Sequence, residues 1–248
     1  MRASAKRWII AALASAALAL TAGAASAGRS HFGWLRATEV LPERGVEMET
    51  WLFEKNGVGD AEESETILWW MTVVGITDQL ELAVPVELRH RAVGDETLLY
   101  GFGAELRWRL VSPDPVEAGP FAPAVRLGVH RLISARDRVR GEAGAGLGVD
   151  LGSRVHLAAD VGATWTVGED DSAAELQPAA GVSVRLVDQL RAGAEVYAEI
   201  VLDGDGVDWI AAGPNLAWTH GRFWISAALG IGIIDIEVAP RVNWAVAF

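Results

Sequence analysis

The strongest constraint on the fold is a two-residue alternation of apolar and polar side chains that runs through most of the chain. Leu80, Leu82 and Val84, for example, alternate with a second set of residues that includes Glu81 and Glu87. Successive side chains of a strand point to opposite faces, so the pattern predicts strands with one apolar and one polar face. The segments match the ~9–11 residues that a tilted strand needs to cross a bilayer. They are longer than the ~5–6 residues typical of soluble strands.

We count about twelve such segments, and their connections alternate in length. Short turns such as 77–79 and 188–189 follow even-numbered segments, whereas longer Gly- and acid-rich connections such as 56–64 follow odd-numbered ones. The connection 112–120 is an exception. The sequence therefore predicts an all-β fold, a transmembrane antiparallel up-and-down β-barrel of about 12 strands with both termini periplasmic. The expected strands are 46–55, 65–76, 80–91, 98–111, 121–131, 139–151, 155–167, 175–187, 190–201, 208–218, 222–233 and 237–248.

The first residues form a three-part export signal. Arg2, Lys6 and Arg7 precede an apolar stretch over 8–20, and small residues end at Ala27. The stretch is shorter than the ~20 residues of a spanning helix, which favours a cleaved signal peptide over an anchor. The expected parts of the chain are a cleaved signal peptide at 1–27, an N-terminal periplasmic or lumenal segment at 28–45, and an outer-membrane barrel at 46–248.

Charge excludes several classes of function. Three basic residues and no acidic ones precede Gly28, which leaves 18 basic and 33 acidic residues and a net charge of −15. Nucleic acid is therefore not an expected partner, because its phosphates need a basic surface. The chain contains no cysteine, so neither a disulfide framework nor a zinc–thiolate site is expected.

The C-terminus carries the most specific motif. The last strand alternates and ends on an aromatic residue, which resembles the β-signal that the barrel-assembly machinery of bacteria reads. The residues of this assembly signal are Val242, Trp244, Val246 and Phe248. Aromatic residues near strand ends also suit girdles at the interfaces of outer-membrane lipid, although several would suit a soluble core equally. These are Trp51, Trp69, Tyr100, Trp108, Trp165, Trp218 and Trp244.

If the apolar face meets lipid, the polar face lines the lumen. The expected lumen-lining residues are Glu81, Glu87, Arg89, Glu105, Arg107, Arg109, Arg126, Arg140, Glu142, Asp160, Arg185, Glu195 and Arg241. Two interpretations stay open. These side chains form a crosslinked plug of ion pairs, or they line a narrow polar path for which interleaved glycines leave room. We favour the narrow path.

No constellation of residues supports an enzyme. No serine stands in a G-x-S-x-G motif, and the five histidines are scattered along the chain. Acidic residues gather in the expected external loops at Asp170, Asp171, Asp203, Asp205 and Asp208, where solvated surface is the usual role. We expect no catalytic residue, no cofactor and no metal site.

A narrower resemblance lies at the start of the barrel, over Thr38–Glu49 (TEVLPERGVEME). A Leu-Pro pair, a glycine and a Glu-alternating first strand are similar to the opening of the putative transporters grouped with the phenol meta-pathway degradation barrels. That resemblance implies passage of small, often hydrophobic molecules across the outer membrane.

Three hypotheses for the function follow. The first is an outer-membrane channel or transporter for a small solute with a narrow charged lumen. The second is a plugged structural or interaction barrel without transport, whose acidic external loops bind ions or a partner. The third is a soluble periplasmic β-protein.

Overall fold

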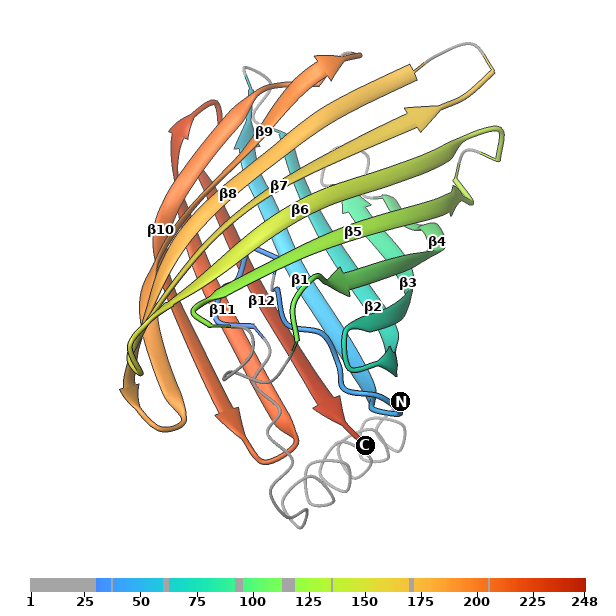
Figure 1. Cartoon of the computed structure of the whole chain (residues 1–248). Coiled ribbons are helices and arrows are strands. Elements are labelled where there is room, and N and C mark those ends of the chain that lie inside the picture. Colours follow the sequence, from blue (N-terminus) through green and yellow to red (C-terminus); the bar gives the residue numbers. More distant parts are fainter. Residues whose placement is uncertain are drawn as a thin grey trace, which may run out of the picture.

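A computed structural model describes residues 30–36, 38–59, 63–91, 96–112, 119–134, 136–169, 172–204 and 206–248. The expected signal peptide, 1–27, lies outside these residues. The described residues form one closed sheet in which each strand pairs with its neighbours along the chain and the first strand closes on the last (Figure 1). All pairings are antiparallel. The predicted all-β antiparallel barrel is confirmed.

The barrel has twelve strands, as expected; β3, β6 and β7 have the predicted bounds, and the others differ from them by up to a few residues. β8, for example, begins at Ser172 rather than at 175. The strands are β1 (Val46–Val58), β2 (Glu63–Thr77), β3 (Leu80–Arg91), β4 (Glu96–Arg109), β5 (Phe121–Leu132), β6 (Val139–Leu151), β7 (Val155–Val167), β8 (Ser172–Val187), β9 (Leu190–Asp203), β10 (Trp209–His220), β11 (Phe223–Ile234) and β12 (Val238–Ala247).

The first and last strands meet along a closing seam. The amide of Phe248 donates a hydrogen bond to the carbonyl of Val46 at 2.9 Å, so β1 starts where β12 ends (Figure 1). We call this the terminal end of the barrel, and the opposite end the loop end. Tight turns such as 78–79 and 188–189 join strands at the terminal end. Residues 113–118 of the unusually long connection, and the predicted acidic loop residues Asp170, Asp171 and Asp205, lie outside the described residues.

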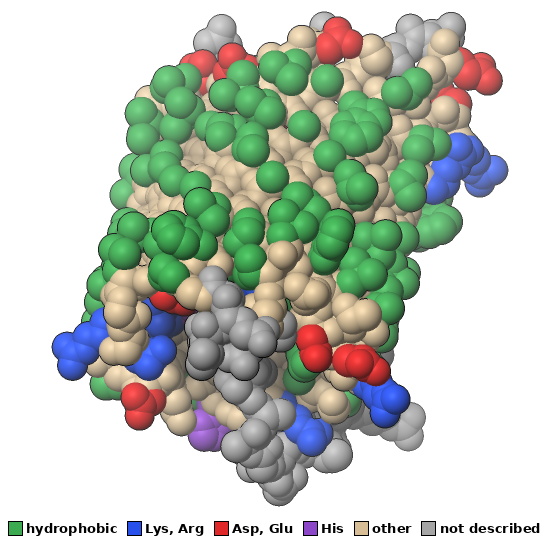
Figure 2. Space-filling model, viewed as in Figure 1, with side chains coloured by type: hydrophobic (Ala, Val, Ile, Leu, Met, Phe, Trp, Pro, Cys, Tyr) green, Lys and Arg blue, Asp and Glu red, His purple; other side chains and the backbone are tan. Residues whose placement is uncertain are grey.

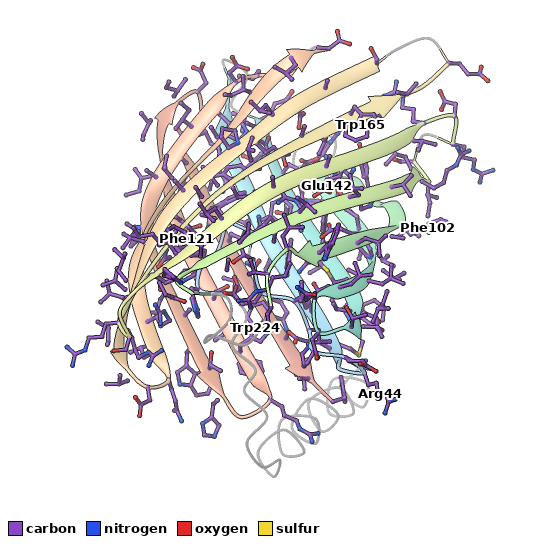
Figure 3. All side chains as sticks on the ribbon, viewed as in Figure 1. Arg44, Phe102, Phe121, Glu142, Trp165 and Trp224 are labelled. Carbon is purple, nitrogen blue, oxygen red and sulfur yellow. The ribbon has the colours of Figure 1, made fainter. Side chains whose placement is uncertain are left out.

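The outer wall carries a continuous apolar band. Figure 2 shows hydrophobic side chains covering the middle of the visible face, with Asp, Glu, Lys and Arg near the two ends. Phe102, Phe121 and Trp165, labelled in Figure 3, belong to this face and are 50%, 54% and 43% exposed. An outward apolar band between polar rims is the surface expected of a barrel that crosses a lipid bilayer. None of the helices among the described residues is long and apolar enough to cross a membrane.

The girdle prediction is wrong for Trp51 and Trp69. Both side chains are buried inside the barrel, where their rings stack with centroids 5.8 Å apart. Alternation along β1 places Trp51 on the inner face with Glu49. The face of the strand, and not the nearness of the residue to a strand end, therefore decides where this side chain lies. Trp108, Trp165 and Trp218 do face outward.

The girdle prediction is also wrong for Tyr100, and here a β-bulge is the reason. Glu87 pairs with Gly101, but the next residue, Leu88, pairs with Leu99. Tyr100 is therefore the extra residue of β4, and such a residue leaves the regular alternation of faces. The bulge turns the phenol ring inward, where it meets Arg89 with the guanidinium carbon 3.9 Å from the ring centroid.

Candidate functional site in the lumen

The segment that precedes β1 lies inside the barrel over its described residues 30–36 and 38–41. Phe32, Trp34 and Leu35 are 2–3% exposed and pack with residues of several strands. The carboxylate of Glu195 on β9 accepts hydrogen bonds from the backbone amides of three successive residues, Gly33, Trp34 and Leu35, at 2.8, 2.8 and 2.9 Å. A charged acceptor strengthens each of these bonds, so Glu195 is the main polar anchor of the segment.

The side chain of Trp34 packs among aromatic side chains of the barrel wall. Its ring lies 4.7 Å from the ring of Tyr197 and 5.8 Å from that of Trp209, centroid to centroid. Its indole nitrogen donates to the carbonyl of Ala239 at 3.0 Å. Gly33 is required beside it, because a Cβ there would lie 2.5 Å from the Cβ of Ala228.

Arg36 connects the segment to several strands of the barrel through its guanidinium group. Its guanidinium pairs with Glu142 at 3.3 Å and with Glu105 at 3.6 Å, and its central carbon lies 4.3 Å from the centroid of the Trp51 ring. These partners come from β6, β4 and β1. A single cation of the segment therefore links strands on different sides of the barrel.

The segment leaves the lumen beside β2 and β3. The amide of Leu41 donates to the carboxylate of Glu81 at 2.6 Å. Gly75 permits this exit, since a Cβ there would meet the carbonyl oxygen of Pro42 at 2.0 Å. The amide of Arg44 then donates to the Gly75 carbonyl at 3.0 Å, and β1 begins at Val46.

His31 lies at the start of the described segment, with its ring edge-on to that of His156, 5.1 Å between centroids. Burial, together with the positive charge of Arg191 and smaller contributions from His156 and Arg185, lowers the pKa of His31 from 6.5 to about 3. His31 is therefore neutral while the segment occupies the lumen.

The residues predicted to line the lumen fall into two groups in the structure. Arg109 is partly buried, Arg89 is 18% exposed, and Arg185 is exposed near the terminal end. The other ten are buried: Glu81, Glu87, Glu105, Arg107, Arg126, Arg140, Glu142, Asp160, Glu195 and Arg241.

Many of these charges form ion pairs with one another. Arg107 pairs with Glu81 at 3.1 Å and with Glu105 at 2.6 Å. Arg140 pairs with Glu87 at 2.5 Å. Such buried charges need partners of opposite sign, because an isolated charge is costly to remove from water. The lumen thus combines the ion pairs of one interpretation with a chain segment that neither interpretation included.

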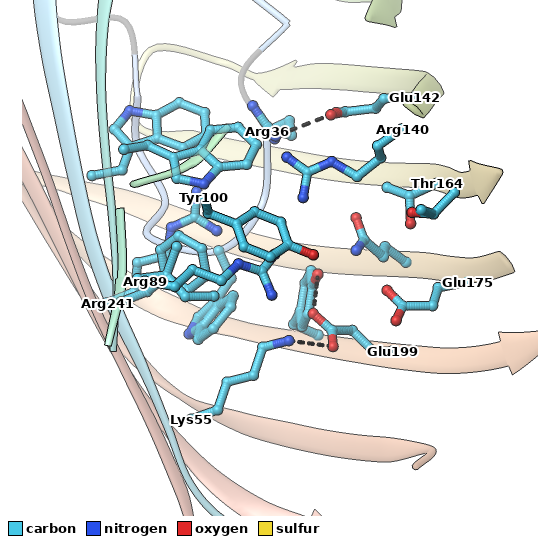
Figure 4. A pocket seen from close by; sticks show the side chains of 18 of the residues that line it. Arg36, Lys55, Arg89, Tyr100, Arg140, Glu142, Thr164, Glu175, Glu199 and Arg241 are labelled. Atoms are coloured by element: carbon cyan, nitrogen blue, oxygen red, sulfur yellow. Dashed lines mark hydrogen bonds and ion pairs between the residues drawn. The ribbon is translucent and has the colours of Figure 1, made fainter. Parts of the chain in front are cut away.

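A chamber of about 300 Å³ occupies the loop half of the lumen (Figure 4). Trp34 and Arg36 of the segment contribute to its floor, and much smaller voids of about 20 and 10 Å³ lie beside the segment. Arg89, Arg241 and Tyr100 lie on one side, with Thr164 and Glu175 on the other (Figure 4). The loop half of the lumen thus contains open space, whereas the segment fills part of the lumen toward the terminal end.

Sequence reasoning missed several residues of this chamber, Trp34, Arg36, Lys55 and Tyr197, whereas alternation along β9 does place Glu199 on the inner face. Lys55 and Glu199 form an ion pair of 2.5 Å. Extending the alternation of β1 from Glu49 would have placed Lys55 on the inner face. The aromatic cluster at Phe32 and Trp34 was a further signal, because such side chains need burial in a folded protein.

Comparisons with solved structures support the same fold. The chain is similar to the COG4313 outer membrane channel from Pseudomonas putida F1, with a TM-score of 0.54 and 12% identity over 85% of this chain and 98% of that one. It is also similar to the β domain of the Bordetella autotransporter BrkA, with a TM-score of 0.55 and 9% identity over 82% and 99% of the two chains. The KdgM porin gives a TM-score of 0.52 and 9% identity over 82% and 99%.

The closed strand order, the apolar outer band and the polar interior define a barrel of the bacterial outer-membrane class. No protein-family model and no curated protein matches this sequence. Identities near 10% show a shared fold only. The resemblance to the phenol meta-pathway transporters is not confirmed.

Proposed function

We propose that this chain is exported to the bacterial outer membrane and acts there as a channel or transporter for a small solute. The observation that carries the proposal is the chamber of about 300 Å³ in the lumen of a barrel with an apolar outer band. Small-solute sites are concave and carry a few convergent polar groups, as this chamber does. In this proposal the termini face the periplasm and the chamber is reached from outside the cell.

Passage through the barrel requires a movement of the N-terminal segment. Residues 30–36 and 38–41 lie between the chamber and the terminal end and belong to no strand of the barrel wall. They are held by the Glu195 carboxylate, by Arg36 and by side-chain packing. Because the strands pair without this segment, its withdrawal would widen the lumen while the barrel stays closed.

The alternative is a plugged barrel without transport that binds ions or a partner at its loops. The extensive ion pairing around Arg107 favours it. Planar-bilayer recording of the refolded mature protein in a salt gradient separates the two. Discrete openings whose ion selectivity changes on Arg140→Gln support the channel. A folded barrel that stays silent under all voltages supports the plugged alternative.

A further inference from the structure

The described residues that line the chamber include more cations than carboxylates. Eight are Lys or Arg and four are Asp or Glu. This surplus is opposite in sign to the net charge of the whole chain, −12. Several of these cations are neutralised nearby, as Lys55 is by Glu199 and Arg140 by Glu87. The ligand preference of the chamber therefore depends on which cation has no carboxylate of its own.

That cation is Arg241 on β12. Its side chain is 6% exposed, and no carboxylate of the described residues forms an ion pair with it. Its Nε donates to the amide oxygen of Asn243 at 3.1 Å, which is a neutral acceptor. The guanidinium lies over the rings of Trp51 and Phe53, at 4.7 and 5.0 Å from their centroids. Aromatic faces hold a guanidinium in place without neutralising it, so its remaining donors stay available to an anion.

Two more buried donors of the chamber lining lack an acceptor. The indole nitrogen of Trp69 and the Nε of Arg140 are buried and have no hydrogen-bond partner among the described residues. Both residues line the chamber, with the guanidinium of Arg140 5.7 Å from the Trp69 ring. Buried donors normally have acceptors, so these two positions of the chamber lining suit a ligand that brings oxygen atoms.

The facing wall has a different chemistry. Thr164 and Thr166 on β7 and Gln177 on β8 line the chamber with neutral groups that both donate and accept hydrogen bonds. Figure 4 shows Thr164 on the side opposite Arg89 and Arg241. A ligand that spans the chamber from Arg241 to Thr164 would therefore meet a guanidinium at one end and hydroxyl and amide groups at the other. Glu175 lies beside Thr164, and Arg140 lies beside Thr166.

We propose that the chamber is a binding site for a small hydroxylated carboxylate of monosaccharide size, such as a sugar acid. The carboxylate lies on the guanidinium of Arg241, and the hydroxyl groups face Thr164, Thr166 and Gln177. A chamber of about 300 Å³ has room for a molecule of this size. This inference rests on the proposed function, because it names the class of solute that the channel would select.

Calorimetric titration of the refolded mature protein in detergent tests the site without requiring transport. The probes are glucuronate and glucose, which share a ring and differ in a carboxylate against a hydroxymethyl group. Glucuronate is expected to bind at least about tenfold more tightly than glucose, because charge-assisted bonds to a buried arginine are the strong ones. Arg241→Gln is expected to weaken glucuronate binding by about tenfold or more, and Arg241→Lys to weaken it less.

Arg44→Gln is the matched control, because it removes the same charge from a side chain that is 90% exposed outside the chamber. It should leave glucuronate binding unchanged. Heat-modifiable gel mobility verifies that each variant is a folded barrel, and Trp69→Phe offers a charge-neutral second variant that removes one donor. Equal affinity for glucose and glucuronate, or unchanged affinity in folded Arg241→Gln, overturns the site.

The proposed site and the proposed function fail in different measurements. A protein that binds glucuronate through Arg241 and conducts no ions retains the site but contradicts transport. A protein that conducts ions and does not bind glucuronate contradicts the site alone.

Discussion

Glu195 holds Trp34 inside the barrel. Its Oε2 accepts a hydrogen bond from the Trp34 amide at 2.8 Å, and the same carboxylate serves the amides of Gly33 and Leu35. One side chain of the wall thus satisfies three consecutive backbone donors of a segment that belongs to no strand. Without this carboxylate the three buried amides would have to find other acceptors or return to water.

The first prediction concerns this anchor. Glu195→Ala should raise the open probability of the channel in planar bilayers, since each buried donor left without an acceptor costs about 1–3 kcal/mol. Glu195→Gln, which keeps one acceptor oxygen, should give an intermediate value. Glu43→Ala is the control, because Glu43 is 55% exposed and lies outside the lumen. Equal open probabilities in wild type and Glu195→Ala would contradict the anchor.

The second prediction concerns the pH dependence of channel opening. The docked segment keeps His31 neutral, with a pKa of about 3, whereas a released His31 would titrate near 6.5. The released state therefore binds more protons below about pH 6.5, and lowering the pH favours release. Open probability should rise as the pH falls from 7.5 to 5, and His31→Gln should reduce this rise. A rise of the same size in His31→Gln would show that other groups cause it.

The third prediction concerns packing around Arg126. Its guanidinium pairs with Asp160 and Glu142, and a Cβ on Gly162 would lie 2.5 Å from one of its nitrogens. Gly162→Val should displace the guanidinium and lower the free energy of unfolding by about 1–3 kcal/mol. Urea unfolding in detergent measures this change. Ala163→Val introduces the same residue on the neighbouring position of β7, which faces outward, and should change stability little.

Twelve strands and most of the inner charged residues could be predicted because alternation is a local property of the sequence. Alternation assigns Glu105 and Arg107 to one face whatever the rest of the chain does. It fails at Tyr100, because a bulge depends on the partner strand. It also gives no information on residues 30–36 and 38–41, which belong to no strand and are held by residues distant in sequence, such as Glu195.

The charged lumen illustrates the same limit. The sequence identifies both Arg241 and Arg107 as inner residues. Whether an inner arginine meets a carboxylate depends on the register of the strands around the barrel, so the local sequence does not distinguish the two. In the structure Arg107 has two carboxylate partners and Arg241 has none among the described residues. That difference is what separates a structural arginine from a candidate ligand-binding one.

The fourth prediction concerns assembly. Phe248 is 66% exposed, and only its backbone amide bonds to the seam. Phe248→Ala should therefore leave the refolded barrel nearly as stable as wild type in urea. In cells it should lower the amount in the outer membrane severalfold, since the assembly machinery reads the terminal aromatic residue. Ala247→Ser tests the position before it as a control, and normal outer-membrane levels of Phe248→Ala would refute the assembly role.

The most direct test of the central claim is planar-bilayer conductance of the mature barrel compared with a variant that lacks residues 30–41. Both proteins are first shown to be folded barrels by heat-modifiable mobility. We predict small or infrequent openings for the full mature chain, and large, steady openings for the shortened one. A shortened barrel that is folded and as silent as the full chain would contradict a channel occupied by its own N-terminal segment.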